Sequence, residues 1–404
     1  MSAGLVIIGG GQAAASAASK LRELDKDVDI TMFCGEPVLP YQRPPLSKKY
    51  LSGEMSLERL VLRPQSWFDE HNVDVRCGCF VDALDVENKQ LTLADGSTRD
   101  YDRLLLATGS HVRRLPPAMN TALQGVHYLR AANHADTMRP HLKPGQNLVV
   151  IGGGYIGLEV AAIAAGMGLN VTVIEMAERI LQRVASPQTS DFFRNLHTSN
   201  GVTILESTGL NALFGEQGRV VGAELADNRV VDADVVLVGI GILPTQSLAE
   251  SAGLAVDNGI LVDAHCRTSN ADIFAAGDCT RFEFDGRHIR LESVPHAIHQ
   301  AEIAAQNMMD EPTEYRATPW FWSDQYDVKL QIAGLNEGYD DTVLRPGKRP
   351  GSQSIWYYRG EQLLAVDALN DAPSFMMARR LLEGGKNLPK SAAGDGETVL
   401  KDYL

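Results

Sequence analysis

An internal repeat is the feature of this 404-residue sequence that most limits how the chain can fold. Residues 5–16 read LVIIGGGQAAAS, and residues 148–159 read LVVIGGGYIGLE. Each copy is an apolar run, a glycine-rich turn and a helix-forming segment, and a second apolar run follows at residues 28–33 and 170–175. Two parallel strands joined by a crossover helix satisfy this pattern. The sequence therefore predicts two βαβ units, each with a dinucleotide site at its glycine turn.

The first turn has the spacing of a dinucleotide-binding turn, with Gly9, Gly11 and Ala14 at its three small positions. Glycine permits a tight turn and the close approach of a pyrophosphate, and a small third residue permits close packing of helix on strand. The helix N-terminus then offers free N–H groups to phosphate. Glu36, just after the next strand, is the candidate ligand of an adenosine ribose. A structural βαβ unit without nucleotide is the alternative.

The second turn has glycine at every small position, namely Gly152, Gly154 and Gly157. Glu175 stands at the end of the following strand, where a carboxylate accepts a hydrogen bond from a ribose 2′-hydroxyl and repels a 2′-phosphate. The sequence therefore predicts NADH rather than NADPH. Arg179 and Arg183 are close enough to leave a phosphate site as the alternative.

Three domains are expected from the order of the segments. Apolar strands at residues 104–106 and 235–241 mark the two points where the chain crosses between nucleotide domains. After residue 312 short strands are expected at 328–335, 354–359 and 363–368, with a helix at 375–382. We expect a first nucleotide domain from residues 1–108 and 236–314, a second from 109–235, and a C-terminal α+β domain from 315–404.

Composition excludes several classes of function. The formal net charge is −14, which repels nucleic acid and anionic lipid. No uncharged apolar run reaches the roughly 18 residues of a membrane-spanning helix, and the first residues lack a secretory pattern, so we expect a cytoplasmic protein. The five cysteines form no C-x-x-C pair, and His288, His296 and His299 lack the partners of a zinc motif. We therefore expect neither a disulfide framework nor a metal site.

Two further segments carry a resemblance to known families. Residues 268–278 read TSNADIFAAGD, which resembles the two-dinucleotide flavoprotein disulfide-reductase superfamily. That resemblance implies a glutathione reductase-like α/β fold with two Rossmann-like domains, and Asp278 bound to the ribityl chain of FAD. Residues 39–48 read LPYQRPPLSK, with no cysteine where disulfide reductases carry a redox pair. This segment resembles NADH-dependent ferredoxin reductases that serve haem-thiolate monooxygenases and ring-hydroxylating dioxygenases.

The ferredoxin reductase resemblance covers nearly the whole chain, with further matches at residues 292–295 (ESVP) and 319–325 (PWFWSDQ). Val294, where many members have tryptophan, makes the putidaredoxin reductase branch the most similar. The resemblance implies hydride transfer from NADH to FAD, then single-electron transfer to a two-iron two-sulfur ferredoxin supplying a cytochrome P-450 monooxygenase. The implied FAD contacts are Gly9, Gly11, Ala14, Glu36, Arg43, Pro45, Lys48, Val81, Ala107, Thr108, Gly109, Arg130, Gly277, Asp278, Ser293 and Val294. The implied NADH contacts are Gly152, Gly154, Tyr155, Ile156, Gly157, Glu159, Glu175, Gly239, Ile240 and Gly241.

A lysine and a glutamate form the polar pair expected at the flavin. The resemblance implies that Lys48 lies beside flavin N5 and that Glu159 holds it. An ammonium there would stabilise the anionic reduced flavin. The alternative is a solvated surface pair, worth about 0–1 kcal/mol and without catalytic effect.

Two tryptophans, Trp320 and Trp322, alternate on one expected strand and therefore point to the same side. One of them can line the flavin edge, although core packing is the more frequent role of such a pair. The helix expected to begin near Pro295 can aim its first N–H groups at the flavin N1 edge.

Basic residues of the C-terminal domain are the expected docking surface, because ferredoxins are usually acidic. The candidates are Arg345, Lys348, Arg349, Arg379 and Arg380, with a solvated face as the alternative. We expect a monomer or weak dimer. One competing function is the reductase component of a ring-hydroxylating dioxygenase, and another is a rubredoxin reductase. A third is an NADH oxidase, which would need a reactive cysteine such as Cys34. From another class, a signalling flavoprotein resembling apoptosis-inducing factor is disfavoured by the net charge.

Overall fold

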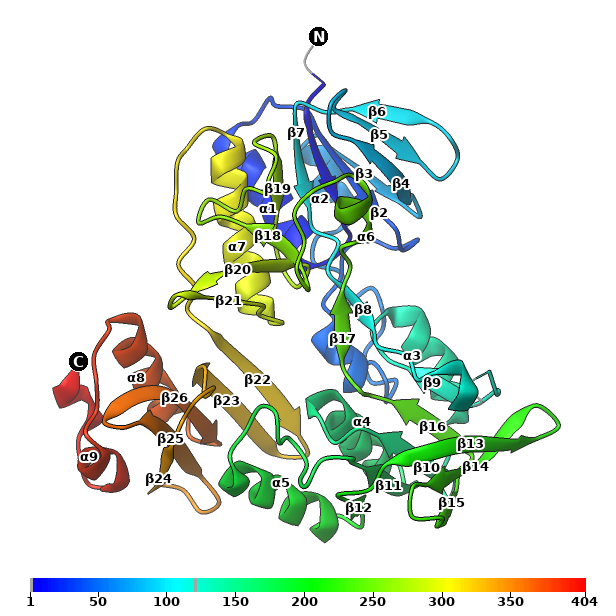
Figure 1. The fold of residues 1–404 in the computed structure, drawn as a ribbon, viewed down its shortest axis with the longest axis vertical. Helices are drawn as coiled ribbons and strands as arrows, with labels where there is room; N and C mark the ends of the chain where they lie inside the picture. Colours follow the sequence, from blue (N-terminus) through cyan, green and yellow to red (C-terminus); the bar gives the residue numbers. More distant parts are fainter. Residues whose placement is uncertain (1–2, 120–121) are drawn as a thin grey trace. The chain divides into compact units, whose positions relative to one another are not determined.

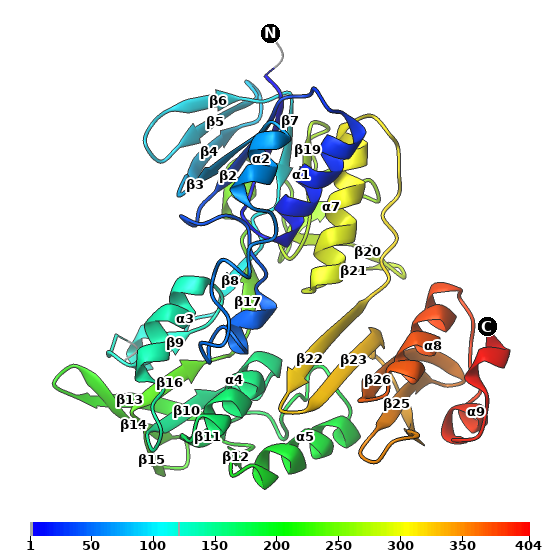
Figure 2. The same ribbon diagram turned by 180° about the vertical axis from the view of Figure 1, so that it is seen from behind.

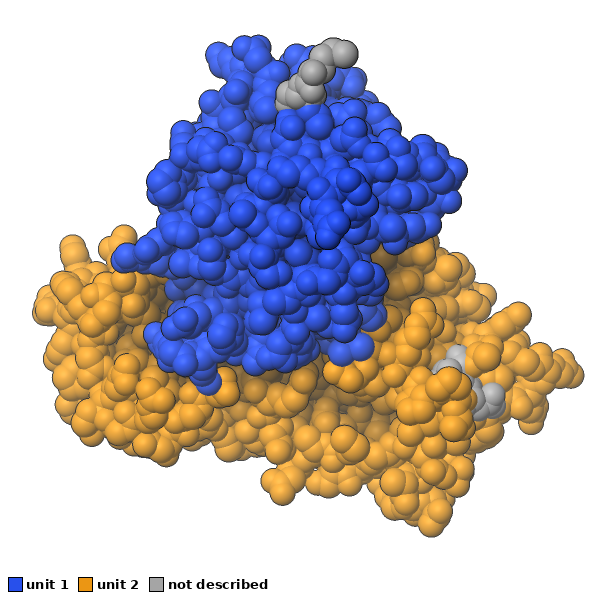
Figure 3. Space-filling view, turned by 45° about the horizontal axis from the view of Figure 1, so that its top comes forward, with its two compact units in different colours: residues 1–43, 56–111, 242–317 blue, residues 44–55, 112–241, 318–404 orange. Residues whose placement is uncertain are grey.

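The computed structural model describes residues 3–119 and 122–404, and the chain divides into two compact units (Figure 3). Unit 1 contains Met1–Arg43, Ser56–His111 and Ile242–Ala317. Unit 2 contains Pro44–Met55, Val112–Gly241 and Thr318–Leu404. The first two residues of the N-terminal segment considered above lie outside the described residues. In the part of the chain that is described, no helix is both long and apolar enough to cross a membrane.

A five-stranded parallel sheet forms the centre of unit 1, in the order β19, β7, β1, β2, β3 (Figure 1). Its strands are β1 (Leu5–Ile8), β2 (Ile30–Cys34), β3 (Val73–Cys77), β7 (Arg103–Leu106) and β19 (Ile273–Ala275). The central strands are buried on both faces, which explains their near-continuous apolar runs. Two helices, α1 (Gln12–Leu24) and α7 (Val294–Met308), lie side by side against this sheet (Figures 1 and 2).

Smaller elements complete unit 1. Two three-stranded sheets are β4 (Val81–Asp85) with β5 (Gln90–Leu93) and β6 (Thr98–Asp100), and β18 (Ile260–Val262) with β20 (Thr280–Phe284) and β21 (Arg287–Ile289). The short helices are α2 (Gln65–Glu70) and α6 (Ser247–Ser251).

Unit 2 repeats the same plan in its first half. Its parallel sheet has the order β12, β11, β10, β16, β9. The strands are β9 (Val126–Tyr128), β10 (Asn147–Ile151), β11 (Asn170–Ile174), β12 (Thr203–Leu205) and β16 (Val235–Val238). The helices are α3 (Ala132–Met138), α4 (Tyr155–Gly166) and α5 (Pro187–Ser199), with single turns at η1 (Pro44–Ser47), η2 (Pro117–Met119) and η3 (Arg139–His141). A small antiparallel sheet adds β13 (Leu210–Glu216), β14 (Arg219–Leu225) and β15 (Val230–Asp232).

The second half of unit 2 is the C-terminal α+β domain. Its antiparallel sheet has the order β22, β23, β26, β25, β24, with bounds β22 (Trp320–Gln325), β23 (Val328–Gly334), β24 (Asp341–Pro346), β25 (Gln353–Arg359) and β26 (Gln362–Leu369). The remaining elements are α8 (Ala372–Glu383), α9 (Lys390–Gly394) and η4 (Leu400–Tyr403). α8 packs on β23 and β26, and Trp356 and Phe375 lie in the buried core between them.

The predicted fold class is confirmed, but the boundaries differ from those expected. β16 pairs with β10, Leu148 standing opposite Val235, so residues 236–241 group with the second nucleotide sheet and not with the first domain. The segment Pro44–Met55 also groups with unit 2. An apolar run in the sequence does not show which sheet it joins, because partner choice depends on contacts distant in the chain. The crossing points contain β8 (Ser110–Val112) and β17 (Ile242–Pro244), which pair with each other.

Candidate functional site

The first glycine turn connects β1 to α1 in unit 1. Gly9 has a φ of 147°, and a Cβ there would lie 2.2 Å from the Ala107 carbonyl oxygen. At Gly11 the nearest atom to such a Cβ is Arg43 Nε, 4.0 Å away, so this position faces open space. Within the described residues no side chain caps the helix that begins at Gln12. A diphosphate site requires a first glycine packed against backbone, a second glycine with free space beside it, and a helix N-terminus without a side-chain cap. The first turn has all three features.

The second glycine turn connects β10 to α4 in unit 2 and has the same design. A Cβ on Gly152 would lie 2.5 Å from the Gly239 carbonyl oxygen, and one on Gly157 would lie 2.2 Å from the Gly152 oxygen. A Cβ on Gly154 would meet no described atom within 4 Å. The outer glycines are thus needed for packing, and the middle one leaves room for a ligand. The residues around both turns therefore fit dinucleotides.

Glu175 is held beside the second turn by the backbone. Its Oε2 accepts a hydrogen bond from Gly153 N at 2.7 Å, and its Oε1 accepts one from Ala177 N at 2.8 Å. The competing cation Arg179 donates to Ser190 Oγ at 2.6 Å. The side chain of the expected ribose ligand is therefore held in place by the backbone, and one of the two arginines of the phosphate alternative is engaged elsewhere.

Glu36 lies two residues beyond the end of β2, and its carboxylate is already shared. Arg43 Nη2 donates to Oε1 at 2.6 Å, and Tyr41 Oη donates to Oε2 at 2.7 Å. The structure thus brings together two residues expected to contact FAD, Glu36 and Arg43, and adds Tyr41, which the sequence reasoning did not single out. The ribose contact of Glu36 stays a prediction.

Asp278 follows Gly277 at the end of β19, in a turn held by two neighbours. Asp278 Oδ2 accepts a hydrogen bond from Ser110 Oγ at 2.9 Å. Gln300 Oε1, buried on α7, accepts from Gly277 N and from Thr280 Oγ1, both at 2.8 Å. Gln300 was missed from the sequence, where the only signal was a polar residue at a buried helical position.

Helix α7 begins at Val294, one residue before the expected Pro295, and Ser293 is its N-cap. Ser293 Oγ accepts a hydrogen bond from His296 N at 3.3 Å, so part of the first turn is already satisfied. His296 Nδ1 lies 2.6 Å from Tyr315 Oη, and burial lowers the pKa of this histidine to about 4. No group of histidine, cysteine and acidic side chains among the described residues is arranged to hold a metal ion.

Lys48 and Glu159 form a buried ion pair within unit 2. Lys48 Nζ lies 2.6 Å from Glu159 Oε2, and the glutamate side chain is 3% exposed. Ser47 Oγ donates to the same oxygen at 2.5 Å, and Ser323 Oγ donates to Oε1 at 2.6 Å. The pair is therefore not a solvated surface pair. Both serines lie in the matched segments, although neither was singled out from the sequence.

The two expected tryptophans lie on β22 with ring centroids 5.8 Å apart. Trp320 also packs 5.8 Å from Phe375 in the core of the C-terminal domain, which favours core packing for this residue. The residue between the tryptophans, Phe321, makes an edge contact with the Tyr155 ring at 5.3 Å. Phe321 thus adds an aromatic contact to the second nucleotide turn that the alternation argument did not find.

The remaining expected FAD contacts divide between the units. Pro45, Lys48 and Arg130 belong to unit 2, and the others belong to unit 1. Thr108, in the segment after β7, donates to the Thr245 carbonyl at 2.6 Å. Val81 is the first residue of β4. All of the expected NADH contacts lie in unit 2, with Gly239, Ile240 and Gly241 directly after β16.

Cys34 is not placed to react directly with an oxidant from solvent. Its side chain is fully buried at the end of β2, and burial raises the pKa of the thiol far above its ordinary value. Residues 39–48 contain no cysteine at all. The geometry therefore disfavours the NADH oxidase alternative.

One of the docking candidates is wrong. Arg345 is buried, 6% exposed, and donates to five backbone carbonyls of the C-terminal segment, those of Ala392, Ala393, Asp395, Gly396 and Thr398. Its charge orders the end of the chain and is not available to a partner. Arg379 is half-buried and pairs with Glu383 at 2.6 Å. The candidates that remain exposed are Lys348, Arg349 and Arg380.

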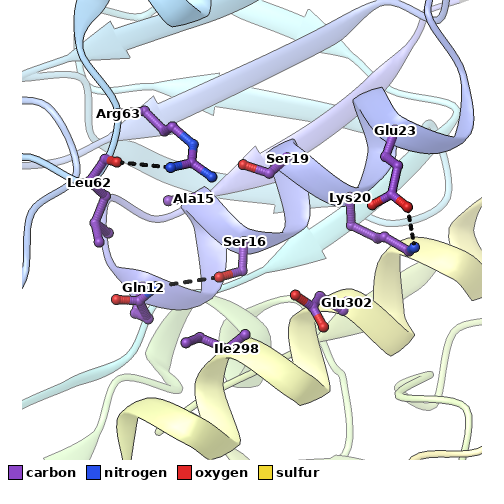
Figure 4. Close-up of a pocket in the computed structure, with 10 residues that line it drawn as sticks. All are labelled: Gln12, Ala15, Ser16, Ser19, Lys20, Glu23, Leu62, Arg63, Ile298 and Glu302. Carbon is purple, nitrogen blue, oxygen red and sulfur yellow. Dashed lines mark hydrogen bonds and ion pairs between the residues drawn. The ribbon is translucent and has the colours of Figure 1, made fainter.

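A hollow of about 350 Å³ runs along the flanks of α1 and α7 in unit 1 (Figure 4). Its charged lining is mixed: Lys20 pairs with Glu23 at 3.1 Å, and Arg63 and Glu302 also line the hollow. Dinucleotides approach the N-terminal end of the helix that follows a glycine turn, whereas this hollow follows the side of α1 as far as Glu23. It is therefore a separate surface feature.

The fold and the two open turns define an oxidoreductase with two dinucleotide sites. Residues 3–301 match the family described as pyridine nucleotide-disulphide oxidoreductase, and residues 320–404 match the reductase C-terminal family. The chain belongs to the pyridine nucleotide-disulphide oxidoreductase family, whose cofactors are FAD and a nicotinamide dinucleotide.

Similar proteins span almost the whole chain. Rhodocoxin reductase of Rhodococcus erythropolis is 42% identical over 98% of this chain and 93% of its own length. A ferredoxin–NAD(P)(+) reductase from a Sphingomonas species is 40% identical over 99% of this chain and 97% of its own. The crystal structure of a covalent putidaredoxin reductase–putidaredoxin complex matches with a TM-score of 0.95 at 37% identity, covering 99% of this chain and 97% of that one. The predicted family is confirmed.

Proposed function

We propose that this chain is an NADH-dependent reductase of a two-iron two-sulfur ferredoxin that supplies a cytochrome P-450 monooxygenase. The observation that carries the proposal is the Lys48–Glu159 pair, buried at the segment where disulfide reductases carry cysteines. A lysine ammonium with no thiol beside it supports electron transfer to an external carrier. The similarity to rhodocoxin reductase and to the putidaredoxin reductase complex supports the kind of acceptor.

The side chains of this protein bind and orient, and they supply charge. The first turn, with Gly9 and Gly11, would hold the FAD diphosphate, and the second, with Gly152 and Gly154, would hold that of NADH. When bound, FAD supplies the chemistry that no side chain has, accepting a hydride from NADH and releasing electrons singly. Glu159 accepts hydrogen bonds from Ser47, Ser323 and Lys48, and this arrangement holds the lysine side chain in place.

NADH is preferred over NADPH because Glu175 presents a carboxylate at the ribose position. Gly153 N and Ala177 N hold that carboxylate, so it cannot turn away to admit a phosphate without losing both hydrogen bonds. The 2′-phosphate of NADPH would lie against the negative charge of Glu175, and such a juxtaposition of like charges costs several kcal/mol in an interface. The discrimination therefore rests on repulsion as well as on attraction.

The decisive experiment is an anaerobic titration of the purified protein with NADH and, separately, with NADPH. We expect flavin absorbance to bleach with one equivalent of NADH and much less readily with NADPH. Mixing the reduced protein with a two-iron two-sulfur ferredoxin should then reduce the carrier in single-electron steps. A colourless protein that takes up no FAD would refute the proposal, and so would a reduced protein that reacts with oxygen but not with any ferredoxin.

Two alternatives use the same sites. A reductase of a ring-hydroxylating dioxygenase, or of a rubredoxin, would share every residue described above and differ only in its carrier. Rates of carrier reduction, measured in parallel with ferredoxins of both oxygenase classes and with a rubredoxin, distinguish these alternatives. The signalling flavoprotein would instead show negligible reduction of any carrier.

A further inference from the structure

Two cysteines stand side by side at the ends of neighbouring strands in unit 1. Cys34 ends β2 and Cys77 ends β3, and the two residues are register partners in the parallel sheet. Paired residues of neighbouring strands lie about 4.8 Å apart, within the roughly 4.4–6.8 Å between Cα atoms that a disulfide spans. Their side chains point to the same face of the sheet.

The two thiols differ in access. Cys34 is fully buried, whereas Cys77 is half-buried on the edge strand of the sheet. A third cysteine, Cys79, follows in the next turn, where its N–H donates to the Cys34 carbonyl at 3.0 Å and its thiol donates to the Cys77 carbonyl at 3.8 Å. Burial raises the pKa of both Cys34 and Cys77. Because Cys77 is the more exposed of the pair, it is the thiol that meets an oxidant from solvent first.

The buried member of the pair supports the first glycine turn. Cys34 Sγ lies 3.5 Å from the Gly9 carbonyl oxygen, and a Cβ on Gly10 would lie 3.0 Å from Cys34 Cβ and 3.3 Å from Sγ. The turn thus rests directly on the Cys34 side chain. Any movement of that sulfur toward Cys77 removes its contact with Gly9 and leaves a gap under the turn.

We propose that Cys34 and Cys77 form a peroxide-sensitive dithiol, whose oxidation to a disulfide loosens the hold of the first glycine turn on FAD. The inference rests on the proposed FAD site. The proposed dithiol lies beneath the first glycine turn. It is distinct from residues 39–48, where a disulfide reductase carries its redox cysteines. The electron path from NADH to the carrier does not pass through it.

The oxidation balances with hydrogen peroxide as the oxidant. The Cys77 thiol loses its proton, and the thiolate sulfur attacks one peroxide oxygen, which breaks the O–O bond and gives a sulfenic acid and hydroxide. The released proton and the hydroxide form water. The Cys34 sulfur then attacks the sulfenic sulfur, its proton leaves with the departing hydroxyl as a second water, and the S–S bond forms. Two thiols are oxidised by two electrons, and one peroxide is reduced to two waters.

The test uses the flavin-loaded protein treated with hydrogen peroxide, quenched with an alkylating reagent and mapped without reduction. Cys77 and Cys79 share one tryptic peptide, because Arg76 and Lys89 flank them, so the Cys79→Ser variant is mapped in parallel. We expect a Cys34–Cys77 cross-link in both proteins, with the buried Cys266 and Cys279 remaining alkylatable only after unfolding. A cross-link confined to Cys77 and Cys79, or over-oxidation of Cys77 without any cross-link, would overturn the proposal.

The second readout is the rate of FAD release, followed by the rise in flavin fluorescence after dilution. We expect roughly tenfold faster release from the oxidised protein, equivalent to about 1.4 kcal/mol of lost binding, and full recovery with dithiothreitol. The Cys77→Ser variant should release FAD at the slow rate with and without peroxide. A formed disulfide with unchanged release, or an equal response in Cys77→Ser, contradicts the mechanism. If the reduced protein never takes up FAD, the proposed function fails, while the cross-link map still decides whether the dithiol exists.

Discussion

Lys48 Nζ lies 2.6 Å from Glu159 Oε2, and the carboxylate is 3% exposed. Breaking a buried pair by removing one charge leaves the other unpaired and costs about 3–5 kcal/mol. Ser47 and Ser323 satisfy the remaining lone pairs of the glutamate, which is the condition under which a buried pair is tolerated. The pair is therefore costly to disturb and confined to one geometry.

Replacing Glu159 by glutamine should lower both stability and electron uptake. The Lys48 ammonium loses its counter-charge, so we expect unfolding free energy to fall by about 3 kcal/mol and flavin bleaching by NADH to slow at least about tenfold. Stopped-flow absorbance and denaturant unfolding measure the two effects. The matched control is Glu23→Gln, which breaks the exposed pair with Lys20 and should cost no more than about 1 kcal/mol. Equal effects in the two variants would show that burial of the pair is irrelevant.

Glu175→Gln should reduce the preference for NADH. The amide loses the charge that repels a 2′-phosphate, so we expect kcat/KM to fall for NADH and to rise for NADPH, narrowing their ratio by roughly tenfold, or about 1.4 kcal/mol. Steady-state kinetics with ferricyanide as acceptor give both values. Glu178→Gln, at an exposed position three residues later, is the control and should leave the ratio unchanged. A ratio that stays fixed in Glu175→Gln would remove this residue from the selectivity argument.

Asp367→Asn should make the protein less sensitive to rising pH. Thr189 Oγ1 donates to Asp367 Oδ2 at 2.7 Å and Tyr357 Oη donates to the same oxygen, but burial dominates and raises the carboxyl pKa from 3.8 to about 6. Because the folded state holds this proton more tightly than the unfolded state, the wild-type protein loses stability as pH rises from about 4 to 6.

The size of that loss follows from the shift and amounts to about 3 kcal/mol. The difference in unfolding free energy between Asp367→Asn and the wild type should therefore grow by up to this amount between pH 4 and pH 7. Urea unfolding of both proteins at several pH values measures it, and the wild type is the control for every other titrating group. A difference independent of pH would show that Asp367 titrates normally.

Reversing two exposed charges of the C-terminal domain should weaken carrier docking. In the Lys348→Glu, Arg349→Glu double variant, we expect slower ferredoxin reduction and a weaker dependence on salt, with ferricyanide reduction unchanged. Lys26→Glu, an exposed charge reversal in unit 1, is the control. Equal losses with ferredoxin and ferricyanide would place these residues outside the docking surface.

Arg345→Ala should behave differently from these charge reversals. We expect it to lower the thermal stability of the protein, because five backbone carbonyls lose their hydrogen-bond donor.

Local patterns in the sequence were sufficient for the glycine turns and their acidic partner. Gly152, Gly154 and Glu175 are linked through one strand, one turn and one helix, so their relation follows from short-range backbone geometry. The same holds for Trp320 and Trp322, whose spacing on one strand predicts a shared face. The pairing of Lys48 with Glu159 was inferred from a resemblance, because more than a hundred residues separate the two in the chain.

Contacts between segments distant in the chain could not be predicted from the sequence. Ser323 bonds to Glu159 across 164 positions, and Gln300 holds the turn at Gly277 from a helix that begins after two intervening strands. The sequence around Arg345 does not show that this side chain is buried among backbone carbonyls, because those carbonyls belong to residues forty-seven or more positions later in the chain. A charge in a polar stretch is usually solvated, so the docking prediction failed there.

The sequence by itself determined the two dinucleotide turns, the absence of a thiol pair at residues 39–48 and the position of Glu175, the carboxylate proposed to select the nicotinamide cofactor. These features depend on residue type and short spacing, which the backbone of a βαβ unit converts directly into geometry. Only the tertiary structure decided which sheet β16 joins, which basic residues are buried, and that Cys34 lies under Gly9 beside Cys77. Such relations arise when burial brings remote segments together, and no local spacing encodes which segments will meet.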